Sequence, residues 1–195
     1  MVFTNARDPH FNGGNWNNPI PIAPAPGSAD PSSSVAAVCP SPGTVEVFWV
    51  RPDGMVFTNA RDPHINGGKW NNPMPIAPAG SADPRSGVGA VCPVHGIVEV
   101  FWIRPDGMVF TNARDYHFNG GNWNNPIPIA PAPGSADPRS QVGAVCPAPG
   151  VVEVFWLTSD GMVFTNARDR QFNGGKWNNP IPIAPAPGSA AIRDV

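Results

Sequence analysis

The chain has 195 residues, of which 27 are proline and 21 are glycine, while charged residues make up only 13%. The net charge is −2 without any run of lysine or arginine, so the basic footprint of proteins that bind nucleic acid or anionic membranes is absent from the sequence. No apolar stretch approaches the roughly 20 residues that cross a bilayer. We therefore expect neither nucleic-acid binding nor membrane insertion.

An octapeptide, Met-Val-Phe-Thr-Asn-Ala-Arg-Asp, begins at Met1, Met55, Met108 and Met162. The spacings are 54, 53 and 54 residues, and the shorter one reflects a single proline missing from the segment 77–81. A proline and glycine excess indicates low complexity only when it has no period. A period near 50 in a chain with 41% hydrophobic residues and seven tryptophans predicts a folded array of packed units.

Each period contains four strand-like segments, at 34–39, 45–50, 55–60 and 73–77 in the first complete copy. The Asp-Gly pair at 53–54 lies between two hydrophobic runs and is typical of a β-hairpin, so the second and third strands pair antiparallel. Turns rich in proline and glycine at 40–43 and 66–68 connect the other strands. Each unit is predicted to be an up-and-down meander.

The two outer strands of this meander differ in composition. Pro19 and Pro21 lie two residues apart, so the N–H groups that they lack belong to one side of the fourth strand, which predicts an outer sheet edge. The first strand is built from Gly, Ala and Val, which suits a crowded axis. We therefore predict an all-β fold, a β-propeller of four-stranded antiparallel blades with about three and a half blades per chain. The expected units are a half blade at 1–30, blades at approximately 31–83, 84–137 and 138–188, and a tail at 189–195.

Three and a half blades leave open hydrophobic faces. We therefore expect a homo-oligomer, most simply a dimer, that completes the propeller ring. The two leftover half blades are the same hairpin and are not complementary to each other, and the tail at 189–195 is a candidate inner strand for the half blade. The sequence begins inside a repeat without a signal peptide, so we expect a soluble protein that is cytoplasmic or is released without a classical signal.

Sugar recognition needs an aromatic ring against the C–H face of the pyranose and planar polar groups that bond its hydroxyls. Both kinds of side chain recur in every unit on the third strand and in the loop that follows it. A structural alternative is that the Arg-Asp pair stabilises the blade and that the later tryptophan caps it. The candidate carbohydrate-binding residues are Asn5, Arg7, Asp8 and Trp16; Asn59, Arg61, Asp62, His64 and Trp70; Asn112, Arg114, Asp115, His117 and Trp123; Asn166, Arg168, Asp169 and Trp177; and Trp49, Trp102 and Trp156.

The last three tryptophans have a stronger structural alternative. Val45, Val47 and Trp49 share one face of a central strand, so we expect this face to pack against the neighbouring blade. Glu46 and its equivalents Glu99 and Glu153 lie on the other face, where we expect them to hold a backbone turn rather than a ligand.

Catalysis and metal binding are not expected. A catalytic site needs a unique constellation of residues, whereas every candidate residue type here recurs in each unit. The histidines come one per repeat, which does not predict a metal cluster, and no cofactor is expected. Cys39, Cys92 and Cys146 are one position repeated three times, so buried free thiols rather than disulfides are predicted.

Several motifs together resemble one family, namely Asp-Gly-Met-Val-Phe, Gly-Gly-Lys/Asn-Trp-Asn-Asn-Pro, Pro-Ile-Ala-Pro-Ala-Gly-Ser at 75–81, and Val-Glu-Val-Phe-Trp-Val. They look like the bacterial seven-bladed propeller lectins typified by the Photorhabdus fucose-binding lectin, and the resemblance covers essentially the whole chain. It implies repeated sites for glycans, with fucose or O-methylated sugars as ligands, and multivalent binding. The alternative is a scaffold, its repeats copied recently or deliberately, that closes into a ring and binds no ligand.

Overall fold

The structure, a computed structural model, describes residues 1–7 and 12–191. These residues form one two-stranded and three four-stranded antiparallel sheets, which confirms the predicted all-β propeller class. The half blade contains β1 (Val2–Thr4) and β2 (Ile20–Ala23). The first blade contains β3 (Ala36–Val38), β4 (Val45–Val50), β5 (Val56–Arg61) and β6 (Met74–Ala77). The second contains β7 (Gly89–Val91), β8 (Ile97–Ile103), β9 (Val109–Asp115) and β10 (Ile127–Ala130). The third contains β11 (Gly143–Val145), β12 (Val151–Leu157), β13 (Val163–Asp169) and β14 (Ile181–Ala184).

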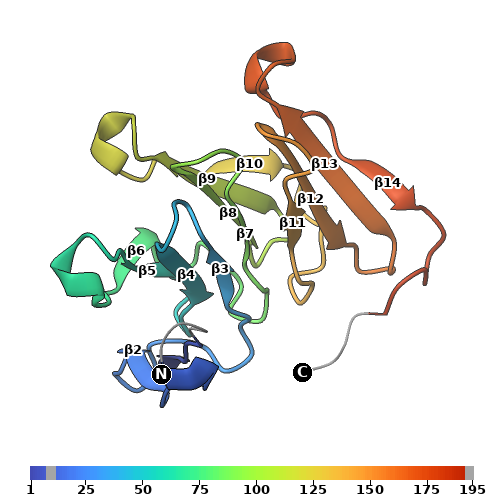
Figure 1. Ribbon diagram of the computed structural model, residues 1–195. Helices are drawn as coiled ribbons and strands as arrows, with labels where there is room; N and C mark the ends of the chain where they lie inside the picture. The colour runs from blue at the N-terminus through green and yellow to red at the C-terminus, as the bar shows by residue number, and fades with distance from the viewer. Residues whose placement is uncertain (8–11, 192–195) are drawn as a thin grey trace.

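The blades fan out from their first strands (Figure 1). The inner strands β3, β7 and β11 lie next to one another, as the small residues predicted for a crowded axis require. The half blade lies at one end of this arc and the third blade at the other (Figure 1). Short 3-10 turns over Asn12–Gly14, Asn66–Gly68, Asn119–Gly121 and Asn173–Gly175 lie in the loops that enter the fourth strands. In the described ranges no helix is long and apolar enough to span a membrane.

The hairpin between the second and third strands forms as predicted. In the first blade Phe48 lies opposite Thr58 and Trp49 opposite Phe57, and Gly54 in the turn has a φ of 76°. A Cβ atom on Gly54 would lie 2.5 Å from the carbonyl oxygen of Ala82 in the crossover to the next blade. Glycine is therefore required both by the backbone conformation and by the close approach of the crossover.

The inner and outer edges differ slightly from the sequence prediction. The first strand covers only Ala36–Val38 rather than 34–39, because Pro40 has no N–H and the innermost strand pairs on one side alone. The fourth strand pairs with the third and ends the sheet, as the alternating prolines predict.

The three cysteines are free, as expected, but Cys39 is exposed and the other two are half-buried, so the prediction of buried thiols was wrong.

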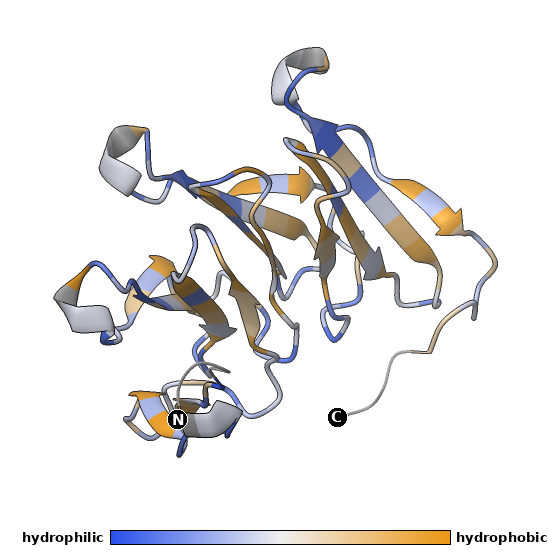
Figure 2. Ribbon diagram, in the orientation of Figure 1, coloured by the Kyte–Doolittle hydropathy of each residue, from blue (hydrophilic) through white to orange (hydrophobic). Residues whose placement is uncertain are grey.

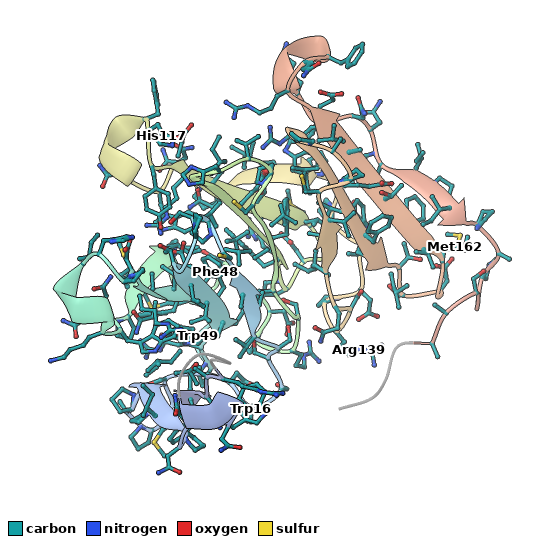
Figure 3. All side chains as sticks on the ribbon, in the orientation of Figure 1. Trp16, Phe48, Trp49, His117, Arg139 and Met162 are labelled. Atoms are coloured by element: carbon teal, nitrogen blue, oxygen red, sulfur yellow. The ribbon has the colours of Figure 1, made fainter. Side chains whose placement is uncertain are left out.

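The first and second blades pack through both faces, and the third blade packs on the second through one face. Val47 and Trp49 contact the half blade, while Phe48 and Val50 face the second blade, so the packing predicted for Val45, Val47 and Trp49 is confirmed. Phe48 and Trp49 point to opposite sides of their sheet (Figure 3). The hydrophobic core is thus divided into layers between blades. Trp49, Trp102 and Trp156 are its largest fully buried side chains.

One hydrogen bond recurs at each blade junction. The side-chain amides of Asn59, Asn112 and Asn166 donate to the backbone carbonyls of Ile22, Ile76 and Ile129 in the preceding unit, at 2.9, 3.0 and 2.8 Å. All three asparagines are about 1% exposed. Each bond fixes a third strand to the outer strand of its neighbour.

Asn112→Ala is expected to destabilise the protein by about 1–3 kcal/mol, because it leaves the carbonyl of Ile76 buried without its partner. The exposed Asn125 offers a matched control, and Asn125→Ala should change stability by less than about 0.5 kcal/mol. Urea unfolding followed by circular dichroism measures both variants. Equal stability of the two variants would contradict a structural role for Asn112.

Candidate functional site

Two cavities recur at one end of the blades, where the hairpin between the second and third strands meets the crossover from the preceding unit. We call them the hairpin pockets. The first has a volume of about 170 Å³ and the second about 220 Å³. The crossover forms one wall of each. The first is lined by Ala23, Ala25, Pro26, Gly27, Ser28, Trp49, Arg51, Phe57 and Pro73; the second by Ala79, Gly80, Ser81, Trp102, Arg104, Phe110 and Pro126.

The tryptophan of each pocket holds the crossover in place. The indole N–H of Trp49 donates to the carbonyl of Ser28 at 2.6 Å, and Trp102 donates in the same way to Ser81 at 2.8 Å. Trp49 also stacks on Phe57, with ring centroids 6.0 Å apart. The pocket therefore has an aromatic floor attached to a backbone wall. The second crossover is one residue shorter than the first, and its pocket is the larger.

An arginine in each pocket is incompletely satisfied. The guanidinium of Arg51 lies 5.4 Å from the ring centroid of Phe57, and that of Arg104 lies 5.4 Å from the ring of Phe110. Each is also within 3.4–3.5 Å of the hairpin aspartate, Asp53 or Asp106. The Nε atoms of both arginines are buried without a hydrogen-bond partner. With side chains 39% and 41% exposed, these guanidinium groups retain donors for a ligand.

The third copy departs from this pattern. Trp156 donates its indole N–H to Ser135 at 2.9 Å and stacks on Phe164, so the aromatic floor is preserved. Thr158 replaces the arginine, and its hydroxyl bonds Asp160 and the carbonyl of Met162. The third junction thus lacks the guanidinium donors.

The candidates on the third strands lie at the opposite end of the blades, where most of them contact the preceding blade. The amides of Asn59, Asn112 and Asn166 are engaged in the junction bonds described above. The indole edges of Trp123 and Trp177 pack on Phe48 and Phe101 with interplanar angles of 87°. These contacts use the side chains for blade packing.

Arg114 and Arg168 form ion pairs across blades. Arg114 lies 2.6 Å from Glu46 and Arg168 lies 2.6 Å from Glu99, each in the preceding blade. The same glutamates accept the hydroxyls of Thr58 and Thr111. The expectation that these glutamates hold a backbone turn was therefore wrong, because twist brings each carboxylate against the next blade's arginine.

These arginines also lie over aromatic rings. Arg61, Arg114 and Arg168 lie 5.9, 5.3 and 5.6 Å from the ring centroids of Trp70, Trp123 and Trp177. Arg114 contacts the Tyr116 hydroxyl as well, and burial together with the charge of Glu46 raises the pKa of Tyr116 to about 12. The Tyr116 ring therefore stays neutral beside the ion pair.

The aspartates of this group cap their own loops. Asp62, Asp115 and Asp169 each accept the backbone N–H two residues further on, from His64, His117 and Gln171 at 2.8–2.9 Å. His64 and His117 are exposed, and His117 stacks on His95 with ring centroids 6.0 Å apart. Within the part of the chain that the structure describes, no three His, Cys, Asp or Glu side chains gather to hold a metal.

A larger cavity of about 370 Å³ lies between the second and third blades at this same end. We call it the loop cavity. It brings together three of the sequence candidates, Arg114, Asp115 and Arg168, with the exposed ring of Phe118. Its remaining lining residues are Ile97, Ala113, Asn124 and Arg170.

The half blade presents its candidates differently. Asn5 and Arg7 are exposed, and Trp16 is 64% exposed; Figure 3 shows Trp16 on the N-terminal unit. No described blade precedes this unit, so these side chains lack the contacts that their equivalents make. Asp8 lies outside the described residues, as do residues 192–195 of the candidate inner strand.

Sequence reasoning missed Arg51 and Arg104. The available signal was their position two residues after the buried tryptophan, directly before the Pro-Asp-Gly hairpin, together with the change to Thr158 in the third copy. Phe57 and Phe110 were also missed as site residues, because strand alternation alone does not distinguish a residue in a pocket wall from a residue in the core.

The buried ion pair generates a pH prediction. Burial raises the pKa of Glu46 above 4.5, although Arg114 and the Thr58 hydrogen bond offset part of this effect. The folded state therefore binds a proton to higher pH than the unfolded state does, and stability falls as pH rises from about 4.5 through the raised pKa. Glu46→Gln removes this titration. The free energy of unfolding of the native chain minus that of the variant should decrease over this interval in urea titrations, and a constant or growing difference would contradict it.

No protein-family model and no curated protein matches this chain. Solved structures do. The chain is 31% identical to the BP39L lectin from Burkholderia pseudomallei over 88% of its own length and 46% of that chain, with a TM-score of 0.72. The SapL1 lectin, solved in complex with alpha methyl fucoside, matches at 18% identity over 90% of this chain and 56% of that one, with a TM-score of 0.60.

The Aleuria aurantia lectin, described as a six-bladed β-propeller with a novel fucose recognition mode, matches at 18% identity over 90% of this chain and 52% of that chain, with a TM-score of 0.51. The chain thus spans about half the length of the lectins it matches. The predicted seven-bladed Photorhabdus type stays a prediction. This chain has the fold of propeller lectins over about half of their ring.

Proposed function

We propose that this chain is a glycan-binding lectin whose sugar sites are the hairpin pockets between blades. The observation that carries the proposal is the repeated combination of a buried tryptophan, a phenylalanine and a partly exposed arginine beneath a crossover. Two junctions contain this combination. The similarity to lectins with the same fold supports it independently.

The chemistry of the pockets matches that of a sugar ring. A pyranose presents an apolar C–H face and hydroxyl groups that both donate and accept. Phe57 and the prolines of the first pocket offer apolar surface, and Arg51 offers donors. Asp53, 3.4 Å from Arg51 and just outside the lining, offers acceptors. The volumes of the two hairpin pockets lie below the roughly 300–1,000 Å³ of sites for drug-sized ligands. Pockets of this size favour a single terminal sugar.

Fucose and O-methylated sugars are the ligands that we place first. Both carry a methyl group, which would contact the Ala and Pro side chains of the crossover wall and exchange hydration for apolar contact. The SapL1 lectin, solved with alpha methyl fucoside, and the Aleuria aurantia lectin, which recognises fucose, share this fold. With several shallow sites on one rigid body, binding to a glycan-coated surface would gain avidity.

The loop cavity is a second location for the same function. Asp115 and the exposed Phe118 there provide an acceptor and a stacking surface, and Arg170 adds a donor. Arg114 and Arg168 are already paired with glutamates, so fewer of their donors are available. The hairpin pockets are therefore preferred.

Replacing both pocket arginines, Arg51→Ala with Arg104→Ala, is expected to lower affinity for methyl α-fucoside at least about tenfold, because hydrogen bonds from a charged donor contribute roughly 1.5–3 kcal/mol. Isothermal titration calorimetry on the folded variants measures the loss. Lys69→Ala, which removes one exposed positive charge elsewhere, should leave affinity unchanged.

Other results have definite meanings. Unchanged affinity in the double variant, with a loss in Asp115→Asn, would move the site to the loop cavity. Failure of the folded native chain to bind any sugar on a broad glycan array would refute the lectin proposal and favour the ligand-free scaffold.

Thr158→Arg restores the missing guanidinium at the third junction. We expect it to raise the number of fucoside sites per chain from two to three, because the aromatic floor of Trp156 and Phe164 is already present. Calorimetric stoichiometry checks this gain. Thr158→Val, which adds no donor, is the matched control, and equal stoichiometry in both variants would show that the arginine does not define the site.

A further inference from the structure

The two ends of the arc are open faces, and they differ in chemistry. The outward face of the third blade exposes residues whose equivalents are buried elsewhere. Ile183 is 52% exposed, whereas the equivalent Ile129 is 3% exposed, and Val145 is 46% exposed against 7% for Val91. Phe155 is half-buried although Phe48 and Phe101 are completely buried. This face, which we call the acceptor face, has the surface of an unmade blade junction.

The acceptor face lacks the partners that internal junctions supply. Glu153 accepts the hydroxyl of Thr165, but no arginine among the described residues pairs with it, whereas Glu46 and Glu99 each pair with one. The carbonyl of Ile183 is equivalent to those of Ile22, Ile76 and Ile129, which accept asparagine amides. The missing partners are thus an amide, a guanidinium and an aromatic edge.

The outward face of the half blade, which we call the donor face, carries these three groups. Asn5, Arg7 and Trp16 stand at the repeat positions of Asn112, Arg114 and Trp123. All three are exposed. Hydrophobic residues are visible on both end units, on β2 and on β14 (Figure 2). The contacts that the third strand and its following loop make in an internal junction therefore have one half on each end of this chain.

We propose that the donor face docks onto the acceptor face of a second copy of this chain, head to tail, forming a two-chain ring. In each junction Asn5 donates to the Ile183 carbonyl, Arg7 pairs with Glu153, and Trp16 packs on Phe155. Two copies are favoured because one chain covers 46–56% of the length of the matched lectins, so two supply a whole ring. This arrangement joins unlike faces, so the two identical half blades do not have to pair with each other.

Charge reversal tests the pairing. Light scattering of the native 195-residue chain should give twice its mass of 20.5 kDa. Arg7→Glu alone places two carboxylates at each junction, and Glu153→Arg alone places two guanidinium groups there. Each variant should dissociate, with the dimer Kd raised at least about 30-fold, which is the low end for disrupting a buried charge pair.

An equimolar mixture of the two folded variants is the decisive experiment, because it tests whether complementary charges restore the dimer. One chain then carries two glutamates and the other two arginines, so both junctions of a mixed dimer are complementary and dimer mass should return. A monomeric native chain, variants that stay dimeric, or a mixture that stays monomeric would each overturn the proposal. Circular dichroism of each variant confirms that loss of mass is not loss of folding. Sugar binding is not required for any arm, so the outcome is independent of the proposed function.

Discussion

The structure depends on the packing of each blade against its neighbours. Each four-stranded blade buries one face against the preceding unit, and the first and second blades also bury the other face against the following unit, so no blade has a core of its own. Trp49 and Phe48 illustrate this, since adjacent residues on one strand belong to two different hydrophobic layers. Stability in such an array is approximately a sum of units and nearest-neighbour interfaces.

Polar groups add register to this hydrophobic packing. A flat apolar interface allows neighbouring sheets to slide, but a buried amide or carboxylate is stable only where its partner lies. The asparagine bond and the Arg–Glu pair therefore specify how far each blade is displaced along its neighbour. Both are expensive to break because removal of one partner leaves the other buried.

Local features of the fold were readable from the sequence. The repeat period, the Asp-Gly hairpin and the alternating prolines each act through their own backbone chemistry, so the strands and their order could be predicted. The partners of polar side chains could not. Arg114 and Glu46 are 68 residues apart, and their contact depends on the twist and spacing of two sheets. For the same reason a sequence that places Asn, Arg and Trp together suggests a site, whereas in the structure these groups mostly join blades. Arg51 and Arg104, the arginines of the hairpin pockets, lie at the opposite end.

The two faces of every blade are unlike, one providing donors and the other acceptors, and this polarity has a consequence for how such chains change length. A duplicated segment of one period enters the array with both of its faces already matched, because its donor face meets an existing acceptor face and its acceptor face meets an existing donor face. Gain or loss of whole periods thus leaves every interface satisfied. The position within a period at which the duplicated segment begins and ends does not alter the chemistry of the blades on either side. The number of repeats is free to vary while the junctions stay the same, and the geometry of ring closure becomes the constraint that selects among lengths.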